Sequence, residues 1–249
     1  MRARGAGRSD PVRGRPWMSG RELLVGGTVA SLMRRGKQLA IVVDDGRALV
    51  VQLGMSGQVL MTPDGPRSHR HVEWVLAPGD GSAMVFRDPR RFGGLVPHAD
   101  VGSLLERWDR ELGPDALDAR KAPIDALRHG TRTVKSALLD QALVAGIGNI
   151  YADEALHAAG IRPTRRCHRL TRDEASRLLD HARRIMRRSV SRGGTSLRDH
   201  VLPGGDPGDA RRLLRAYGRA GLPCRTCGSV MRGARLGGRA TAWCTSCQR

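Results

Sequence analysis

Four of the five cysteines in this 249-residue chain fall within its last 26 residues. They form two Cys-x2-Cys pairs separated by sixteen residues: Cys224, Cys227, Cys244 and Cys247. Two such turns joined by a hairpin can present four thiolates to one ion, which is the tetrahedral shell of a structural zinc site. Paired disulfides are disfavoured, because no apolar signal segment opens the chain. The spacing predicts one structural Zn²⁺ with no open position for activating water, and it leaves Cys167 as an ordinary thiol.

The chain is strongly basic, with a formal net charge of +19 at pH 7. Residues 161–249 carry 21 Arg or Lys against 6 Asp or Glu, which accounts for +15 of that charge. Such a potential attracts polyanions, so nucleic acid is the expected partner and the C-terminal third is its expected contact surface. The alternative is an arginine-rich proteome, which would raise the charge without specifying a partner. Only three of the 43 basic residues are lysines, namely Lys37, Lys121 and Lys135. A lysine is therefore unusual in this arginine-rich chain.

Two kinds of pattern divide the sequence. Short apolar segments separated by Asp-Gly and Pro-Gly turns predict an antiparallel β-sandwich or barrel, and they lie at 25–33, 39–43, 47–53, 57–61, 71–77 and 83–87. After Leu112 helical spacing takes over, and Thr171-x-x-Glu174 is a capping box that opens a helix over 171–191. A Gly-rich stretch at 203–208 predicts a mobile loop, followed by a short helix near 209–216.

These patterns predict an α+β multidomain protein. Its expected parts are an irregular basic segment over 1–22, a β-sandwich domain over 23–112, a helical domain over 113–216 and a zinc-finger hairpin over 217–249. No apolar run approaches the length of a membrane span. We expect a monomer located in the cytoplasm at the nucleoid.

A glycine turn lies between two of the helical patterns, over residues 145–151, with Asn149 where the next helix is expected to begin. Asparagine is a favoured N-cap, and a helix start with nearby glycines leaves backbone N–H groups able to bind a phosphate. A plain loop between two helices has the same composition. From these residues alone both interpretations stay open.

Four motifs occur together in the chain: Gln-Leu-Gly-Met-Ser-Gly at 52–57, Asp-Pro-Arg-Arg-Phe-Gly at 88–93, the run over 145–154, and Tyr-Gly-Arg at 217–219 ahead of the cysteine module. In this order they resemble the formamidopyrimidine-DNA glycosylase family, whose related branch is endonuclease VIII. The resemblance extends from about residue 23 to the C-terminus. It implies a β-sandwich domain, a helix–two-turn–helix domain and a zinc-finger hairpin. It also implies a base-excision DNA glycosylase and AP lyase that acts on damaged double-stranded DNA, most commonly on oxidised purines.

The resemblance assigns roles to six residues besides the four cysteines. Met55, Arg90 and Phe92 match the family residues that fill the space left when the damaged nucleotide is extruded. Lys37, which matches the catalytic-site lysine of the family's β-hairpin, would grip phosphates together with Asn149 and Arg239. From residue type alone, core packing is the alternative for Met55 and Phe92, and solvent exposure is the alternative for Arg239.

One part of the family pattern is missing from this sequence. The family's nucleophile is an N-terminal proline followed by glutamate, whereas this sequence begins Met-Arg-Ala-Arg and none of its thirteen prolines precedes a glutamate. Either the native protein begins further upstream, or this chain binds DNA without the full reaction. Gln52 in place of the usual histidine and Ala142 in place of a frequent lysine favour the second explanation slightly.

Three further interpretations follow from that departure. An α-amino group or Lys37 could form an imine with an abasic aldehyde and cleave the strand by elimination. Glu22 and Glu73 are candidate acids only by their proximity in sequence. A zinc-ribbon protein that binds nucleic acid without chemistry is the remaining alternative, and the motifs at 52–57 and 88–93 argue against it.

Overall fold

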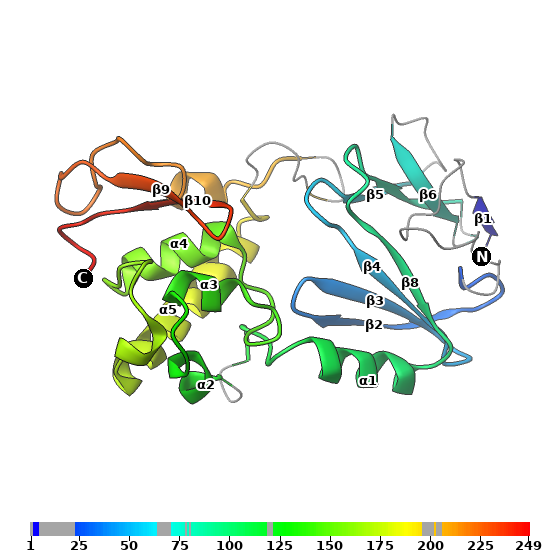
Figure 1. Cartoon of the computed structure of the whole chain (residues 1–249). Coiled ribbons are helices and arrows are strands. Elements are labelled where there is room, and N and C mark those ends of the chain that lie inside the picture. Colours follow the sequence, from blue (N-terminus) through cyan, green and yellow to red (C-terminus); the bar gives the residue numbers. More distant parts are fainter. Residues whose placement is uncertain are drawn as a thin grey trace. The chain divides into compact units, whose positions relative to one another are not determined.

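The computed structural model describes residues 2–4, 23–63, 71–77, 79, 81–118, 122–195, 202 and 206–249. Contacts divide the chain into two compact units, each described by itself below. Unit 1 comprises Met1–Arg110 and Gly193–Asp209, and unit 2 comprises Glu111–Arg192 and Ala210–Arg249. Figure 1 shows strands gathered in unit 1 and helices with one hairpin in unit 2.

Unit 1 contains two antiparallel four-stranded sheets, as the predicted β-sandwich requires. One sheet has the order β1-β6-β7-β5, with β1 at Arg2–Arg4, β5 at Gln58–Thr62, β6 at Val72–Ala77 and β7 at Ala83–Arg87. The other has the order β2-β3-β4-β8, with β2 at Val29–Arg35, β3 at Gln38–Val43, β4 at Ala48–Gln52 and β8 at Gly94–His98. Six of these strands coincide with the predicted apolar segments, while β8 was not predicted.

The core of unit 1 comes from alternate residues of its strands, because successive side chains of a strand point to opposite faces. Its buried members are Leu24, Ile41, Val43, Leu49, Val51, Trp74, Leu76, Phe86 and Leu95. The Trp74 and Phe86 rings stack with centroids 5.1 Å apart. Helix α1, Val101–Glu111, contacts the second sheet through Trp108, whose Nε1 donates to Gln38 Oε1 at 2.7 Å. This helix lies where only strands and turns were predicted.

Unit 2 is built from four helices and a two-stranded hairpin. The helices are α2 (Ile124–Arg128), α3 (Val134–Leu139), α4 (Asn149–Ala158) and α5 (Arg172–Val190), with a 3₁₀ turn, η1, at Cys167–Arg169. The hairpin pairs β9 (Arg232–Leu236) with β10 (Arg239–Trp243). One apolar core joins the helices and includes the buried free thiol of Cys167.

The predicted capping box at the start of α5 is confirmed. Thr171 Oγ1 accepts from the Glu174 N–H at 3.1 Å, and the Thr171 N–H donates to Glu174 Oε2 at 2.8 Å. Both groups are backbone donors that the first turn of a helix would otherwise leave without a partner.

The helix predicted near 209–216 is wrong in length, because only the 3₁₀ turn η2, Ala210–Leu213, forms there. The backbone N–H groups of Arg215, Ala216 and Tyr217 all donate to the Glu154 carboxylate at 2.8 Å. These donors are therefore not available to carbonyls one helical turn earlier, and the helix cannot continue.

Some predicted segments lie partly outside the described residues. Within the segment predicted to be irregular, residues 2–4 form β1 and pair antiparallel with β6, while 1 and 5–22 are not among the described residues. The same holds for 203–205 of the predicted Gly-rich loop, for Glu22 and for Lys121. Within the described part of the chain, no helix has the length and apolar character needed to cross a membrane.

Candidate nucleic-acid interface and metal centre

Two loops of unit 1 are joined by the buried carboxylate of Asp88. Its Oδ1 accepts from Ser56 Oγ at 2.6 Å, and its Oδ2 accepts from the Gly93 N–H at 2.7 Å. A Cβ atom at Gly54, which has φ +61°, would lie 2.6 Å from the Gly93 nitrogen. The hydrogen bonds of Asp88 therefore hold the loops at 52–57 and 88–93 together as one surface.

Met55, Arg90 and Phe92 project from this surface. Met55 is 58% exposed and Phe92 is 50% exposed, so neither belongs to the core. The guanidinium carbon of Arg90 lies 4.9 Å from the centroid of the Phe92 ring, which is a cation–π contact. Large apolar side chains held in the open beside a cation suit insertion into a base stack.

Lys37 lies at the tip of the hairpin that joins β2 and β3. Arg35 pairs with Gln38 across a two-residue turn, in which Gly36 has φ +58°. A glycine with positive φ at the first turn position is the preference of a tight type II′ hairpin. The turn leaves Lys37 exposed.

Glu73, one of the two glutamates considered as an acid, is engaged in an ion pair. Its carboxylate lies 3.1 Å from Arg91 Nε. The other, Glu22, is not among the described residues.

In unit 2, Arg239 stands at the tip of the β9–β10 hairpin. Leu236 pairs with Arg239 across Gly237 and Gly238, and both glycines have positive φ, as a type I′ turn requires. Arg239 is exposed at the first position of β10. The rest of the strand is buried from Thr241 to Trp243, which fixes the base of the hairpin.

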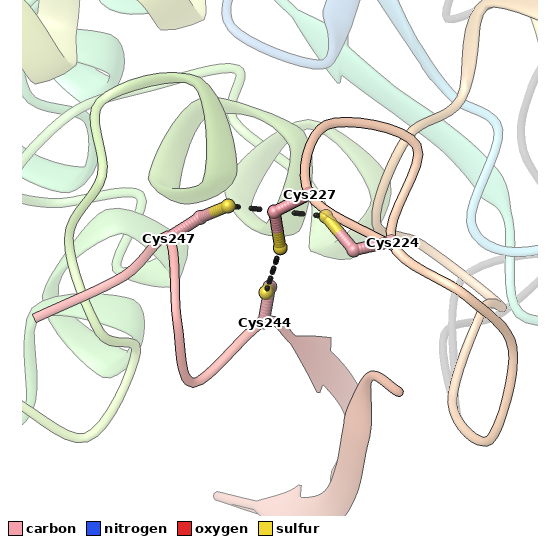
Figure 2. A group of neighbouring side chains, drawn as sticks. All are labelled: Cys224, Cys227, Cys244 and Cys247. Atoms are coloured by element: carbon pink, nitrogen blue, oxygen red, sulfur yellow. Dashed lines mark hydrogen bonds between the residues drawn. The ribbon is translucent and has the colours of Figure 1, made fainter. Parts of the chain in front are cut away.

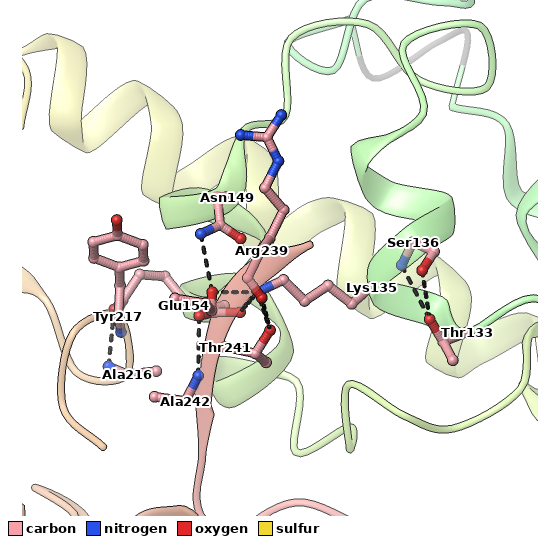
Figure 3. A network of polar contacts seen from close by, with 12 residues as sticks. Thr133, Lys135, Ser136, Asn149, Glu154, Ala216, Tyr217, Arg239, Thr241 and Ala242 are labelled. Atoms are coloured by element: carbon pink, nitrogen blue, oxygen red, sulfur yellow. Dashed lines mark hydrogen bonds and ion pairs between the residues drawn. The ribbon is translucent and has the colours of Figure 1, made fainter. Parts of the chain in front are cut away.

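Asn149 does not cap α4 as predicted, because the N-cap is Gly148 and no side chain caps this helix. Asn149 is the first residue of α4, and its Nδ2 donates to the backbone carbonyl of Ala240 at 3.0 Å. The side chain therefore joins the start of α4 to the residue that follows Arg239. In Figure 3 the Asn149 and Arg239 side chains lie next to each other.

The Ala240 carbonyl also accepts a hydrogen bond from a buried lysine, Lys135. Lys135 Nζ lies 2.7 Å from Thr241 Oγ1 (Figure 3). It also lies 2.6 Å from Asp153 Oδ1 and 3.1 Å from the Ala240 oxygen. Asp153 in turn accepts from the Ala242 N–H at 3.2 Å. These contacts hold the first half of β10 against α3 and α4.

Burial opposes charge on both members of this pair. It lowers the pKa of Lys135 and raises the pKa of Asp153 to about 6, although the mutual ion pair acts against both shifts. The 2.6 Å separation of Lys135 and Asp153 is that of an ion pair. Neither residue was assigned a role from the sequence, and the rarity of lysine in this chain was the signal that could have identified the pair.

The four predicted cysteines come together at the other end of the hairpin (Figure 2). All four sulfur atoms lie within 4.8 Å of one another, with 4.0 Å between Cys224 and Cys247 and 3.5 Å between Cys227 and Cys244. A tetrahedron with metal–sulfur bonds of 2.3 Å has sulfur atoms about 3.8 Å apart, so the cluster fits a metal ion with four thiolate ligands. The Ser229 hydroxyl beside Cys227 lowers the pKa of that thiol to about 6, whereas the neighbouring cysteines raise the pKa of Cys247 to about 12.

The structure thus groups the predicted residues by unit. In unit 2, Asn149 and Lys135 both donate to the carbonyl of the residue that follows Arg239. The four cysteines lie at the base of the same β9–β10 hairpin. Met55, Arg90 and Phe92 share one surface of unit 1, and Lys37 occupies a separate hairpin of that unit.

Comparisons with known proteins agree across both units. The family model described as "Formamidopyrimidine-DNA glycosylase N-terminal domain" matches residues 7–95, and "Formamidopyrimidine-DNA glycosylase H2TH domain" matches residues 112–201. The chain is 42% identical over 232 residues to the formamidopyrimidine-DNA glycosylase of Xanthomonas oryzae pv. oryzae, covering 91% of this chain and 84% of that protein.

Two solved structures resemble the chain closely. The MutM (Fpg) protein of Thermus thermophilus has a TM-score of 0.79 and 36% identity, over 90% of this chain and 84% of that one. Lactococcus lactis Fpg in complex with abasic-site DNA has a TM-score of 0.79 and 31% identity, over 91% and 84%. The motifs, the paired sheets, the helical unit with its cysteine hairpin and these matches lead to one conclusion: the chain belongs to the formamidopyrimidine-DNA glycosylase family.

Proposed function

We propose that this protein is a base-excision repair DNA glycosylase and AP lyase that binds damaged duplex DNA and acts on oxidised purines. The observation that supports it most is the joint anchoring of Asn149 and Arg239. The carbonyl of Ala240, the residue after Arg239, accepts hydrogen bonds from both Asn149 and Lys135. An amide and a guanidinium held side by side form a preorganised grip for backbone phosphates. The family membership and the relative solved with abasic-site DNA support the same partner.

In this proposal six side chains have a task in recognition. Lys37, Asn149 and Arg239 hold phosphates near the damaged nucleotide. Extruding a nucleotide costs a few kcal/mol, which side chains inserted into the stack partly offset. Met55 and Phe92 would fill the vacated space, and Arg90, already aligned over Phe92, would address the orphaned base.

We further propose that the metal is Zn²⁺, held by Cys224, Cys227, Cys244 and Cys247. When bound it supplies rigidity to the hairpin and takes no part in bond cleavage, because four thiolates fill its tetrahedral shell. With DNA as its partner, the protein would work as a monomer at the nucleoid in the cytoplasm.

The alternative function on the same scaffold is recognition of damaged or abasic sites without excision of a base. Product analysis after incubation with a duplex that contains 8-oxoguanine separates the two functions, because only the first releases the base.

The partner itself is tested by equilibrium binding of the purified, zinc-loaded chain to two duplexes that differ only in one abasic site. We expect clear preference for the abasic duplex at every salt concentration. Equal affinity for both duplexes, falling together as salt rises, is the behaviour of a nucleic-acid-binding protein without damage recognition and would contradict the proposal.

A further inference from the structure

Unit 2 contains a pocket of about 480 Å³ on which the proposed function places no demand. Five of its six lining residues are arginines, and the full set is Arg162, Thr164, Arg165, Arg166, Arg169 and Arg249. The volume lies in the range of small-ligand sites, which is about 300–1,000 Å³. The lining suits an anion with several charged oxygens.

The walls of this pocket are held by backbone and side-chain hydrogen bonds. The Arg162 N–H donates to the Arg249 carbonyl at 3.0 Å, and the Arg249 N–H donates to the Gly160 carbonyl at 2.9 Å. Gln248, fully buried, donates from Nε2 to the Ile161 carbonyl at 2.9 Å. These hydrogen bonds hold Arg249 beside the segment that follows α4. The Arg249 side chain therefore lines the same pocket as the arginines of that segment.

Most of the positive charge in the pocket is not neutralised. Glu174 pairs with Arg165 at 2.8 Å, whereas Arg166 Nη1 donates to the neutral carbonyl of Thr131 at 2.7 Å. Among the described residues, the guanidinium groups of Arg162, Arg169 and Arg249 have no hydrogen-bonded or ionic partner. The five guanidinium groups at the pocket face only two carboxylates, those of Glu174 and of the C-terminal residue Arg249, so the pocket keeps an excess of three positive charges.

The pocket is separate from the grip formed by Asn149 and Arg239. Asn149 is the first residue of α4, while the pocket residues begin after the last, Ala158. The two sites share no residue, and a ten-residue helix, about 15 Å long, separates Asn149 from the start of the pocket segment.

We propose that this arginine pocket is a second phosphate-binding site, which holds the backbone of duplex DNA at a distance from the lesion. Guanidinium groups bind phosphate oxygens as bidentate forks, and several converging forks select a polyphosphate over a single small anion. The interaction carries no base specificity, so it adds affinity for long duplexes whether or not they are damaged.

The test replaces Arg162, Arg169 and Arg249 together by Gln and compares this pocket variant with a control that carries Arg177→Gln, Arg184→Gln and Arg188→Gln in α5. Both variants lose the same charge. Binding of a long undamaged duplex is measured over a range of salt concentrations, after circular dichroism and thermal unfolding show that both variants are folded. Each phosphate that the protein no longer neutralises is expected to reduce the slope of log K against log salt by roughly 0.9. The slope should therefore fall by about two to three in the pocket variant and by clearly less in the control. Equal reductions in both variants would overturn the proposal.

A second measurement titrates inorganic tripolyphosphate into the same zinc-loaded proteins. We expect it to bind the wild type and the control variant, to compete with long duplex DNA, and to fail with the pocket variant. Tripolyphosphate binding at the pocket without any change in the DNA slope would assign the pocket to free polyphosphate and overturn its role in DNA binding. Preference for an abasic site in a short duplex is measured separately, so failure here and failure of the proposed function give different results.

Discussion

Lys135 holds Arg239 in place without reaching the surface itself. Its ammonium group is fully buried, and it contacts three acceptors, two of which belong to the residues that directly follow Arg239. A buried charge of this kind is tolerated only because Asp153 lies 2.6 Å away. The pair thus links the stability of unit 2 to the alignment of the phosphate grip.

Replacing Lys135 by Met should destabilise the protein strongly, because it leaves the Asp153 carboxylate buried without a counter-ion. We expect the free energy of unfolding to fall by about 3–5 kcal/mol, measured by denaturant titration. The double variant Lys135→Met with Asp153→Leu removes both charges and should regain most of that loss. Both variants should bind abasic DNA more weakly than the wild type, since both lose the Lys135 hydrogen bonds to Ala240 and Thr241 and keep only that of Asn149. Equal stability of the single and double variants would contradict the pairing.

Arg239→Ala should weaken binding to abasic DNA and reduce the salt dependence of log K by about 1, the change expected when one phosphate is no longer bound. Arg232→Ala is the matched control, since Arg232 is exposed on the same hairpin and pairs with Trp243 at its opposite end. Similar losses of affinity in the two variants would show that Arg239 acts only through net charge.

For single residues, the sequence motifs indicated which residues to consider but not the contacts that those residues make. The motifs indicated Asn149 and Arg239, but Asn149 was expected to cap its own helix and instead bonds a carbonyl 91 residues away. A long-range contact of this kind leaves no trace in local spacing. Lys135 and Asp153 are eighteen residues apart on different helices, and nothing in their spacing indicates an ion pair.

Among the elements, helix α5 should make the stability of the protein depend on pH through Glu174 in its first turn. Burial alone would raise the pKa of Glu174, but hydrogen bonds from Arg165 and the Thr171 N–H outweigh it and lower that pKa below 4.5. A carboxyl group whose folded pKa is depressed contributes stability above its unfolded pKa and loses it as pH falls through the folded value.

Glu174→Gln should therefore destabilise the protein at pH 7 by about 1 kcal/mol, the usual value of a helix cap. At pH 3, below the ordinary pKa of glutamate, the difference between wild type and variant should be smaller, because this stabilisation is lost as pH falls towards the depressed folded pKa. Thermal unfolding at both pH values checks this, with exposed Glu106→Gln of α1 as control. A difference that stays constant with pH would contradict the assignment.

We expect the β9–β10 hairpin to depend on the proposed metal, because the four clustered thiols give it little apolar core of its own. We expect one Zn²⁺ per chain by elemental analysis, and loss of the fold of this hairpin on chelation. Cys227→Ser should release the metal and weaken binding of abasic DNA, with Cys167→Ser as the control that leaves zinc content unchanged. Full zinc occupancy in Cys227→Ser would contradict the four-sulfur shell.

Two elements escaped prediction for different reasons. Pro97 interrupts the apolar run of β8, and proline is tolerated there because β8 lies at the edge of its sheet. Helix α1 did carry a helical pattern in Val101, Leu104, Leu105 and Trp108, but it falls within a region dominated by strand and turn signals. By contrast, the strands bounded by Asp-Gly and Pro-Gly turns and the capped helix α5 follow from local rules alone.

For the whole molecule, composition predicted the partner and motif order predicted the family. The net charge of +19 indicated a polyanion, and the four ordered motifs indicated the glycosylase family that the comparisons then showed. The grouping of the helices with the cysteine hairpin in one compact unit was not predictable, since it depends on Glu154 and Lys135 contacts between segments 61 to 106 residues apart.

Recognition of damaged DNA with excision of the damaged base is tested by borohydride trapping. The zinc-loaded chain is incubated with a duplex containing 8-oxoguanine, an abasic duplex and a plain duplex, each in the presence of borohydride. We expect a covalent protein–DNA adduct with both damaged duplexes and none with the plain one, and peptide mapping would then identify the amine that attacks C1′. Preferential binding of damaged DNA without an adduct on the 8-oxoguanine duplex would contradict the glycosylase activity and leave damage recognition as the function.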